Sequence, residues 1–147
     1  MAIKKFLTSR TWYELTWTLG IHTSLKSNRV RGWYGEWLAC CYLRKKNFSI
    51  LRKNWQSSFD ARREIDLIAM DNECLVFVEV RARSKNALNS GYRSINHRKR
   101  KSILVACRDF LRIDYEKFPF YRFDVIEVDL EQKNGSVLHH QNVSLFT

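Results

Sequence analysis

Two apolar segments in the middle of the chain, residues 63–70 (REIDLIAM) and 74–82 (CLVFVEVRA), contain charged side chains. Their Ile, Leu, Val and Phe residues are typical of strands buried in a sheet. Four charged residues lie inside these runs rather than at their ends: Glu64, Asp66, Glu79 and Arg81. Burying a charge is costly unless a partner or an ion compensates it. The sequence therefore predicts a sheet whose strands hold a charged site.

The rest of the chain predicts helices packed on that sheet. The expected elements are, in order, a helix at 33–46, strands at 48–55, 64–70 and 74–82, a helix at 96–113 and a strand at 121–130. Asn96 is the expected N-cap of the second helix. This order predicts an α/β fold in which helices flank a mixed sheet.

We expect one domain at residues 31–134, with a variable N-terminal extension (1–30) and a C-terminal tail (135–147) that is frayed or forms one short strand. The extension contains aromatic residues such as Trp12 and Trp17. A short helix docked on the domain, or disorder, is favoured for it. The alternative, an interfacial membrane anchor, is weaker because the extension is short and its apolar face is small.

The charge of the chain indicates a polyanionic partner. Its 147 residues include 26 Lys and Arg against 15 acids, a formal net charge of +11. Nucleic acid is the first expectation and an anionic membrane surface the second. The four cysteines form no CxxC pair and lie in apolar runs, so neither a zinc site nor a disulfide framework is expected. With no transmembrane-length apolar segment or signal peptide recognised, we expect a cytoplasmic protein.

The two charged strands predict a hairpin whose register decides whether their acids meet. With a two-residue loop at 71–72, Asp66 lies opposite Phe77. Glu64 then lies opposite Glu79, and Glu79 is a diagonal neighbour of Asp66 on one face. A three-residue loop would put the two acids on opposite faces. In the two-residue case the core on the other face is formed by Ile65, Leu67, Val76, Val78 and Val80.

Paired carboxylates repel each other unless they are protonated or bridged by a cation. Oxygen ligands favour Mg²⁺ or Mn²⁺ over zinc, and such an ion can activate water at a phosphodiester. Arg81 would share the face of Glu79 and could bind the phosphate or position the water. The alternative is an ordinary ion pair of Arg81 with Glu79 or Glu64 at a sheet edge.

Two helical residues could join this site. Glu36 is the only acid of the first predicted helix, and Lys99 lies one turn before Ile103 on the core side of the second. Each has a simpler explanation. Glu36 could be an acid favoured by the helix dipole, and Lys99 could belong to a solvated basic face.

A basic segment follows the second charged strand. It contains eight Lys or Arg residues and no acid: Arg81, Arg83, Lys85, Arg93, Arg98, Lys99, Arg100 and Lys101. A basic loop that runs into a helix N-terminus is suited to phosphate, because backbone N–H groups and the helix dipole add to the charge. We therefore expect this segment to contact a nucleic-acid backbone.

Four blocks in this order resemble those of the YraN family of small nuclease-like proteins. They are GEWLACCYLRKKNFSILRKNW, EIDLIAMDNECLVFVEVRAR, RKRKSILVACRDFL and RFDVIEV, and the resemblance spans about residues 32–128. That family is similar to the PD-(D/E)XK nuclease superfamily, near archaeal Holliday junction resolvases. The resemblance implies a restriction-endonuclease-like αβββαβ core, and by analogy with resolvases a homodimer.

The resemblance also assigns roles. Asp66 matches the metal-binding aspartate, Glu79 the acid of the E-x-K signature, and Arg81 its basic position. Glu36 matches the glutamate of the first helix and Lys99 the lysine that opens the second. Catalytic roles are thus expected for all five, with Asp66, Glu79 and Glu36 as metal ligands.

Two positions depart from the family pattern. Residue 63 is Arg where Gly is usual, and Arg81 replaces the more typical lysine. Arginine stays protonated, so it can bind phosphate but cannot act as a base. We expect a Mg²⁺- or Mn²⁺-dependent endonuclease acting on branched or single-stranded DNA. The alternatives are a non-catalytic nucleic-acid-binding protein of the same fold, or a structural protein whose charged strands form ion pairs.

Overall fold

A computed structural model of the chain describes residues 9–21, 24–25, 27–83, 95–114, 117–131 and 136–145. Its helices are α1 (Ser9–Thr18), α2 (Asn28–Lys45) and α3 (His97–Asp114). Its strands are β1 (Ser49–Gln56), β2 (Glu64–Asp71), β3 (Cys74–Arg83), β4 (Phe120–Asp129) and β5 (Ser136–His140). The predicted α/β fold is confirmed, with α1 and β5 added to the αβββαβ order.

The described strands form one five-stranded sheet in the order β1-β2-β3-β4-β5. The first three strands are an antiparallel meander, β3 and β4 are parallel, and β5 returns antiparallel to β4. A parallel pair needs a long crossover connection, and α3 lies in the one between β3 and β4. The C-terminal residues thus form a strand at the sheet edge, the second of the two expected outcomes.

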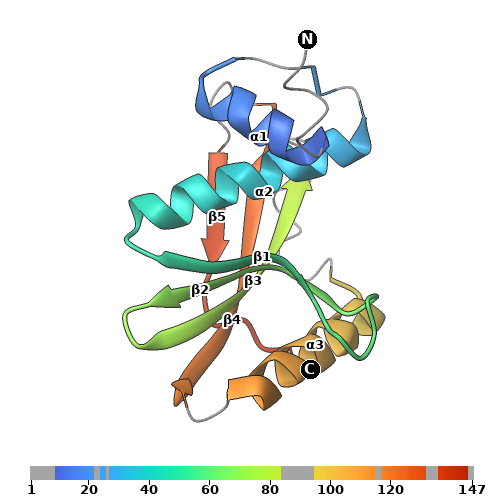
Figure 1. Ribbon diagram of the computed structural model, residues 1–147, viewed down its shortest axis with the longest axis vertical. Helices are drawn as coiled ribbons and strands as arrows, with labels where there is room; N and C mark the ends of the chain where they lie inside the picture. Colours follow the sequence, from blue (N-terminus) through green and yellow to red (C-terminus); the bar gives the residue numbers. More distant parts are fainter. Residues whose placement is uncertain are drawn as a thin grey trace.

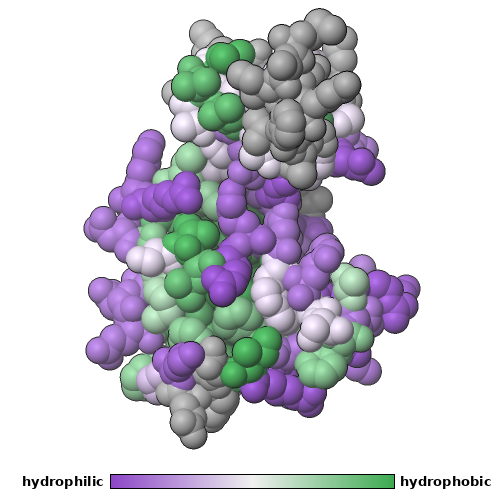
Figure 2. Space-filling model, in the orientation of Figure 1, coloured by the Kyte–Doolittle hydropathy of each residue, from purple (hydrophilic) through white to green (hydrophobic). Residues whose placement is uncertain are grey.

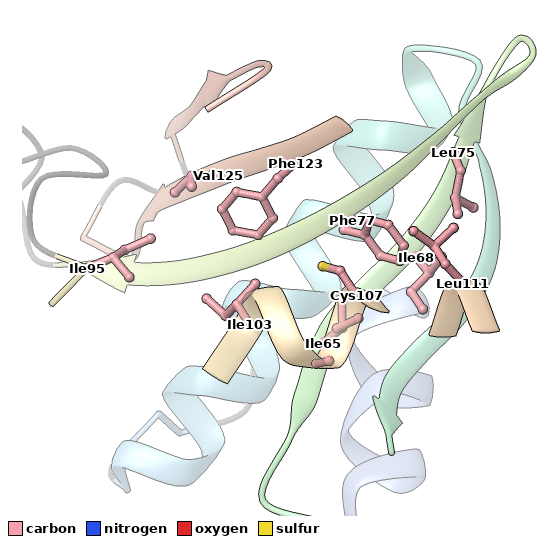
Figure 3. Packing of buried hydrophobic residues seen from close by; sticks show 11 residues of the cluster. Ile65, Ile68, Leu75, Phe77, Ile95, Ile103, Cys107, Leu111, Phe123 and Val125 are labelled. Carbon is pink, nitrogen blue, oxygen red and sulfur yellow. The ribbon is translucent and has the colours of Figure 1, made fainter. Parts of the chain in front are cut away.

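Helices cover both faces of the sheet, α2 one face and α3 the other (Figure 1). The core under α2 includes Ala39, Cys40, Leu43, Leu67, Ala69, Val76, Val78, Ile126 and Val128. The core under α3, seen in Figure 3, includes Ile65, Ile68, Leu75, Phe77, Ile103, Cys107, Leu111, Phe123 and Val125. Strands buried on both faces explain why their sequences are almost continuously apolar.

The four cysteines are free in this structure, and two of them pack as small apolar side chains. Cys40 lies in the core under α2 and Cys107 in the core under α3. Burial raises the pKa of the Cys40 thiol to about 11 and also raises the pKa of Cys107.

The N-terminal extension contributes a helix that packs on the outer side of α2, so docking is the expectation that the structure supports. The Trp17 ring is buried, and its centroid lies 5.0 Å from that of Tyr34 and 5.9 Å from that of Trp37. Tyr13 stacks on Trp17 with centroids 5.6 Å apart. Aromatic pairs at such separations contribute beyond the apolar area they bury.

α2 begins earlier than the sequence pattern indicates. Its N-cap is Ser27, whose side chain accepts a hydrogen bond from the backbone N–H of Val30, and the helix continues to Lys45. Residues 28–32 (NRVRG) were not predicted to be helical, because Val30 is the single apolar side chain among them besides Gly32 and no apolar period is visible. The predicted N-cap of α3 is confirmed, since Asn96 Oδ1 accepts from the backbone N–H of Lys99 at 2.8 Å.

A buried glycine sets the distance between α2 and the sheet. A Cβ atom at Gly35 would lie 2.9 Å from the Cβ of Ala82 on β3, whereas a Cβ at Gly32 would meet nothing within 4 Å. Contacts under 3.0 Å force the backbone apart. Gly35 therefore allows α2 to approach the end of β3, where the charged residues lie.

We expect Gly35→Ala to lower the free energy of unfolding by about 1–3 kcal/mol, because overpacking outweighs the gain in helix propensity. Gly32→Ala is the matched control and should raise it by roughly 0.5–1 kcal/mol. Urea unfolding measures both, and Gly35→Ala combined with Ala82→Gly should recover part of the loss. Equal stability of the two alanine variants would contradict this role for Gly35.

Candidate active site

The sheet divides at one end between its second and third strands. The β2–β3 ladder stops at the pair Leu67–Val78. Beyond it, β2 stays paired with β1 as far as Glu64, and β3 stays paired with β4 as far as Arg83. Figure 1 shows β1 and β2 turning away from β3 and β4 at this end. The division opens the sheet where the predicted site residues lie.

Asp66 lies at the point of division. Its Oδ2 accepts a hydrogen bond from the backbone N–H of Val80 at 2.7 Å. A carboxylate thus satisfies a strand N–H group that has no ladder partner on β2. The same contact holds Asp66 beside Glu79, the residue before Val80.

The predicted hairpin register was wrong by two residues. The loop is 72–73 rather than 71–72, so Phe77 lies opposite Ile68 instead of Asp66. A shift of two residues preserves which side chains share a face, so the expected proximity of the two acids survives. One core residue does change side: Ile65 packs under α3, because the alternation of β2 breaks where the sheet divides.

Both acids of the pair resist ionisation. Burial, and then the nearby carboxylate of Glu79, raise the pKa of Asp66 to about 8. Burial also raises the pKa of Glu79, which is only 4% exposed, although Lys99 and Arg81 oppose the shift. Two desolvated carboxylates that lie close enough to interact disfavour a second negative charge. The positive charge around Asp66 and Glu79 is therefore too small to keep both carboxylates ionised.

Two cations contact Glu79. The Lys99 Nζ atom lies 3.3 Å from Glu79 Oε2, and the Arg81 Nη1 atom lies 3.6 Å from Glu79 Oε1. Lys99 therefore reaches the site, as the first of its two interpretations predicted, while part of its side chain stays exposed. Arg81 does pair with Glu79, but on a central strand and not at a sheet edge. Its Nε is buried with no hydrogen-bond partner in the part of the chain that the structure describes.

Glu36 belongs to the neighbourhood but is held by other residues. Its Oε2 accepts hydrogen bonds from Arg10 Nη2 at 2.7 Å and from Asn54 Nδ2 at 2.6 Å. Its charge contributes to the raised pKa of Asp66. Because α2 begins at Asn28, Glu36 lies well inside the helix, so the helix dipole does not explain it.

Arg10 is a site residue that sequence reasoning missed. It comes from α1, and it also binds Glu14 at 3.0 Å and the side chain of Asn54. Within the described ranges, no three His, Cys, Asp or Glu side chains are arranged to hold a metal ion. Glu64 is exposed at the start of β2, and its charge adds slightly to the raised pKa of Glu79.

Asp124, a fully buried aspartate, shows the opposite electrostatic state to the partly exposed Asp66. Burial would raise the pKa of Asp124, but hydrogen bonds from His139, Arg122 and the backbone of Asn142 lower it below its usual value. Its two oxygens accept these bonds at 2.8 to 3.2 Å. Asp124 is thus a fully compensated structural charge, whereas Asp66 is not.

Two further buried acids on β4 were also missed by sequence reasoning. Glu127 lies beside Arg81 in the parallel register, and Asp129 lies two residues beyond. Each has one buried carboxylate oxygen that makes no hydrogen bond to the described residues. The run RFDVIEVDL indicates only a strand, so no pattern in it separates these acids from exposed ones.

The basic residues of the predicted interface divide into three groups. Arg98, Lys99 and Lys101 line one cavity beside the first turns of α3. Arg100 instead donates from Nε to the carbonyl of Ile95 at 2.9 Å, so it braces the helix start. Lys85, Arg93 and the side chain of Arg83 lie outside the described residues.

Comparison with known proteins identifies the family. The sequence model of the "Uncharacterised protein family UPF0102" matches residues 35–128. A UPF0102 protein of Pseudomonas aeruginosa is 38% identical over 109 residues, which cover 73% of this chain and 84% of the relative. The chain belongs to the UPF0102 family. Another UPF0102 protein, from Dichelobacter nodosus, is 38% identical over 117 residues, covering 80% of this chain and 90% of the relative.

Membership in UPF0102 confirms the YraN-like part of the resemblance, while the link to nucleases stays a prediction. The region matched by the UPF0102 model contains Glu36, Asp66, Glu79, Arg81 and Lys99. Arg10 precedes that region, so the ion-pair partner of Glu36 comes from outside the family match. None of the described helices has both the length and the apolar composition to cross a membrane.

The raised pKa of Asp66 makes stability depend on pH. Between its ordinary value of 3.8 and about 8, the folded protein retains a proton that the unfolded chain releases, so stability falls as pH rises through this window. Asp66→Asn keeps an acceptor for Val80 without the charge. In EDTA, Asp66→Asn should raise Tm by about 5 °C at pH 8.5, which corresponds to a gain of roughly 1–2 kcal/mol in the free energy of unfolding. At pH 4 the variant should change Tm little.

Thermal unfolding followed by circular dichroism measures this effect. Glu73→Gln, at an exposed turn position, is the control and should leave Tm unchanged at both pH values. Equal destabilisation of Asp66→Asn at both pH values would mean that the carboxylate is charged and well compensated in the folded state.

Proposed function

We propose that this protein is a metal-dependent endonuclease that hydrolyses phosphodiester bonds in DNA, preferentially in branched (Holliday-junction-like) or single-stranded forms. The observation that supports this most directly is the Asp66–Glu79 pair, with Lys99 Nζ 3.3 Å from Glu79. A buried and a partly buried acid beside a cation, at the open end of a sheet, are suited to phosphate chemistry. Perturbed ionisation in such a place is a general mark of function.

The donor set fits a hard divalent cation. Mg²⁺ is commonly held by one or two carboxylates, with water and substrate phosphate oxygens completing its shell, so Asp66 and Glu79 are sufficient ligands. The raised pKa of both acids reflects a shortage of positive charge that such an ion would remedy. Bound there, Mg²⁺ or Mn²⁺ would activate water and neutralise charge on the phosphodiester.

The cations of the chain then have separate tasks. Lys99 binds the phosphate whose ester bond is cleaved, because it already lies within contact of Glu79. Arg81 places a fixed positive charge beside Glu79. This charge stabilises the negative charge that develops on the phosphate. Since arginine does not lose its proton at ordinary pH, this chemistry assigns Arg81 an electrostatic role only.

Glu36 has a conditional role. In this structure Arg10 and Asn54 occupy its Oε2. Displacement of the Arg10 guanidinium would release the Glu36 carboxylate from its ion pair, and its negative charge could then help to complete or orient the metal shell. Arg10 thus competes with the metal for Glu36.

A second candidate function is nucleic-acid binding without turnover. Two observations favour it: Arg81 replaces the usual lysine, and Arg10 neutralises Glu36. The basic surface serves both functions equally, so only a cleavage assay separates them.

Asp66→Ala and Glu79→Ala should each reduce cleavage at least about 100-fold, because one metal ligand is lost, while DNA binding stays the same or strengthens. The assay uses labelled four-way junction, flap, single-stranded and duplex DNA with Mg²⁺, Mn²⁺ or EDTA. Glu73→Gln controls for a change of charge. Binding without cleavage under any metal by the unaltered protein would favour the second candidate function.

Arg10→Met should tighten Mn²⁺ binding by roughly three- to tenfold, because it removes a positive charge beside the site and releases Glu36. Isothermal titration calorimetry measures the affinity. The control is Arg44→Met, an exposed arginine near the end of α2. Unchanged affinity in Arg10→Met would contradict the competition between Arg10 and the metal.

A further inference from the structure

A basic groove lies next to the proposed active site. It has a volume of about 660 Å³ and lies between the β1–β2 connection and the first turns of α3. Its charged lining residues are Asp60, Arg62, Arg63, Arg98, Lys99 and Lys101. In Figure 2, hydrophilic side chains border the lower right of the molecule, where Figure 1 places α3. Arg62 and Arg63 were not among the residues expected to bind nucleic acid.

Ion pairs hold the wall formed by the connection in place. Arg63 Nη1 lies 3.2 Å from Asp109 Oδ2 of α3, and the Ser57 hydroxyl donates to the same oxygen at 2.7 Å. Both contacts tie the β1–β2 connection to α3. Asp60 accepts from Arg62 at two oxygens, each at 3.0 Å. The groove is therefore built by packed elements and is not an incidental surface hollow.

The charge of the groove selects an anionic ligand. Five of its nine lining residues are Lys or Arg, against one acid that is already paired. Arg62 keeps an 89% exposed side chain, so it can contact a ligand while bonded to Asp60. No aromatic side chain is among the nine, so the described lining offers no stacking surface for a base. These properties match a sugar–phosphate backbone.

Lys99 connects the groove to the acidic pair. It is a lining residue of the groove, and its Nζ also contacts Glu79. Phosphates that follow the groove toward Lys99 therefore reach the position where cleavage is proposed. The β1–β2 connection ends at Arg63, three residues before Asp66, and Lys99 of the other wall contacts Glu79, so each wall leads to one acid of the pair.

We propose that this groove binds the phosphodiester backbone of one DNA strand and guides it to Asp66 and Glu79. This inference rests on the proposed function, since the strand in the groove is the one to be cut. Arg62 and Lys101 supply the opposing positive charges of the two walls. Recognition of this kind is independent of base sequence and strongly dependent on salt.

The test is fluorescence anisotropy of labelled single-stranded and duplex DNA between 50 and 200 mM NaCl, with EDTA present. The double variant Arg62→Gln, Lys101→Gln should bind at least about fivefold more weakly at the higher salt. The slope of log K against log salt should fall in magnitude by roughly 0.7–1.8, as expected for one or two lost phosphate contacts. Lys45→Gln, Lys46→Gln removes the same charge at the exposed end of α2 and is the matched control.

Equal losses of DNA affinity in the two double variants would overturn the proposed role of the groove, because only the total charge of the protein would then matter. Absence of DNA binding by the unaltered protein at 50 mM NaCl would overturn both the groove and the proposed function. A loss confined to the groove variant, in a protein that cleaves no DNA with any metal, would support the groove and overturn the endonuclease. The two proposals therefore fail in distinguishable ways.

Discussion

The hydrogen bond from the Val80 backbone to the Asp66 carboxylate is the contact on which the candidate site depends. Where two central strands separate, their backbone groups lose ladder partners, and leaving them buried and unpaired would be costly. Asp66 satisfies one of these groups and in doing so is held next to Glu79. The same contact thus stabilises the divided sheet and assembles the acidic pair.

The N-terminal helix extends this arrangement. Aromatic packing around Trp17 fixes α1 on α2, which allows Arg10 to reach Glu36. Asn54 then links Glu36 to β1 and, at 3.4 Å, to the backbone carbonyl of Asp66. A segment outside the UPF0102 match is therefore in contact with a residue inside it. The electrostatics of the site depend on α1 as well as on the sheet.

Local patterns in the sequence predicted much of this fold. The charges inside apolar runs located Asp66 and Glu79. The alternation of side chains along the strands correctly placed the two acids on one face, although the hairpin loop was misplaced by one position. Helical spacing placed Lys99 on the core side of α3. Arg10 could not be predicted, because its contact with Glu36 depends on how two helices pack. The groove wall at Arg62 was missed for the same reason, because its place beside α3 depends on how the β1–β2 connection packs on that helix through Arg63 and Asp109.

The distribution of partners explains why Asp66 differs from the other acids of the site. Glu36 has Arg10, Glu79 has Lys99 and Arg81, but no cation of the described chain lies within ion-pair distance of Asp66. Burial and the charge of Glu79 therefore raise the pKa of Asp66 to about 8, with no ion pair among the described residues to oppose them. A divalent cation that binds here must displace that proton, so metal binding and ionisation of Asp66 are coupled. Within the described ranges, the fold leaves the Asp66 carboxylate without a compensating side chain, at the point where the basic groove meets the divided sheet.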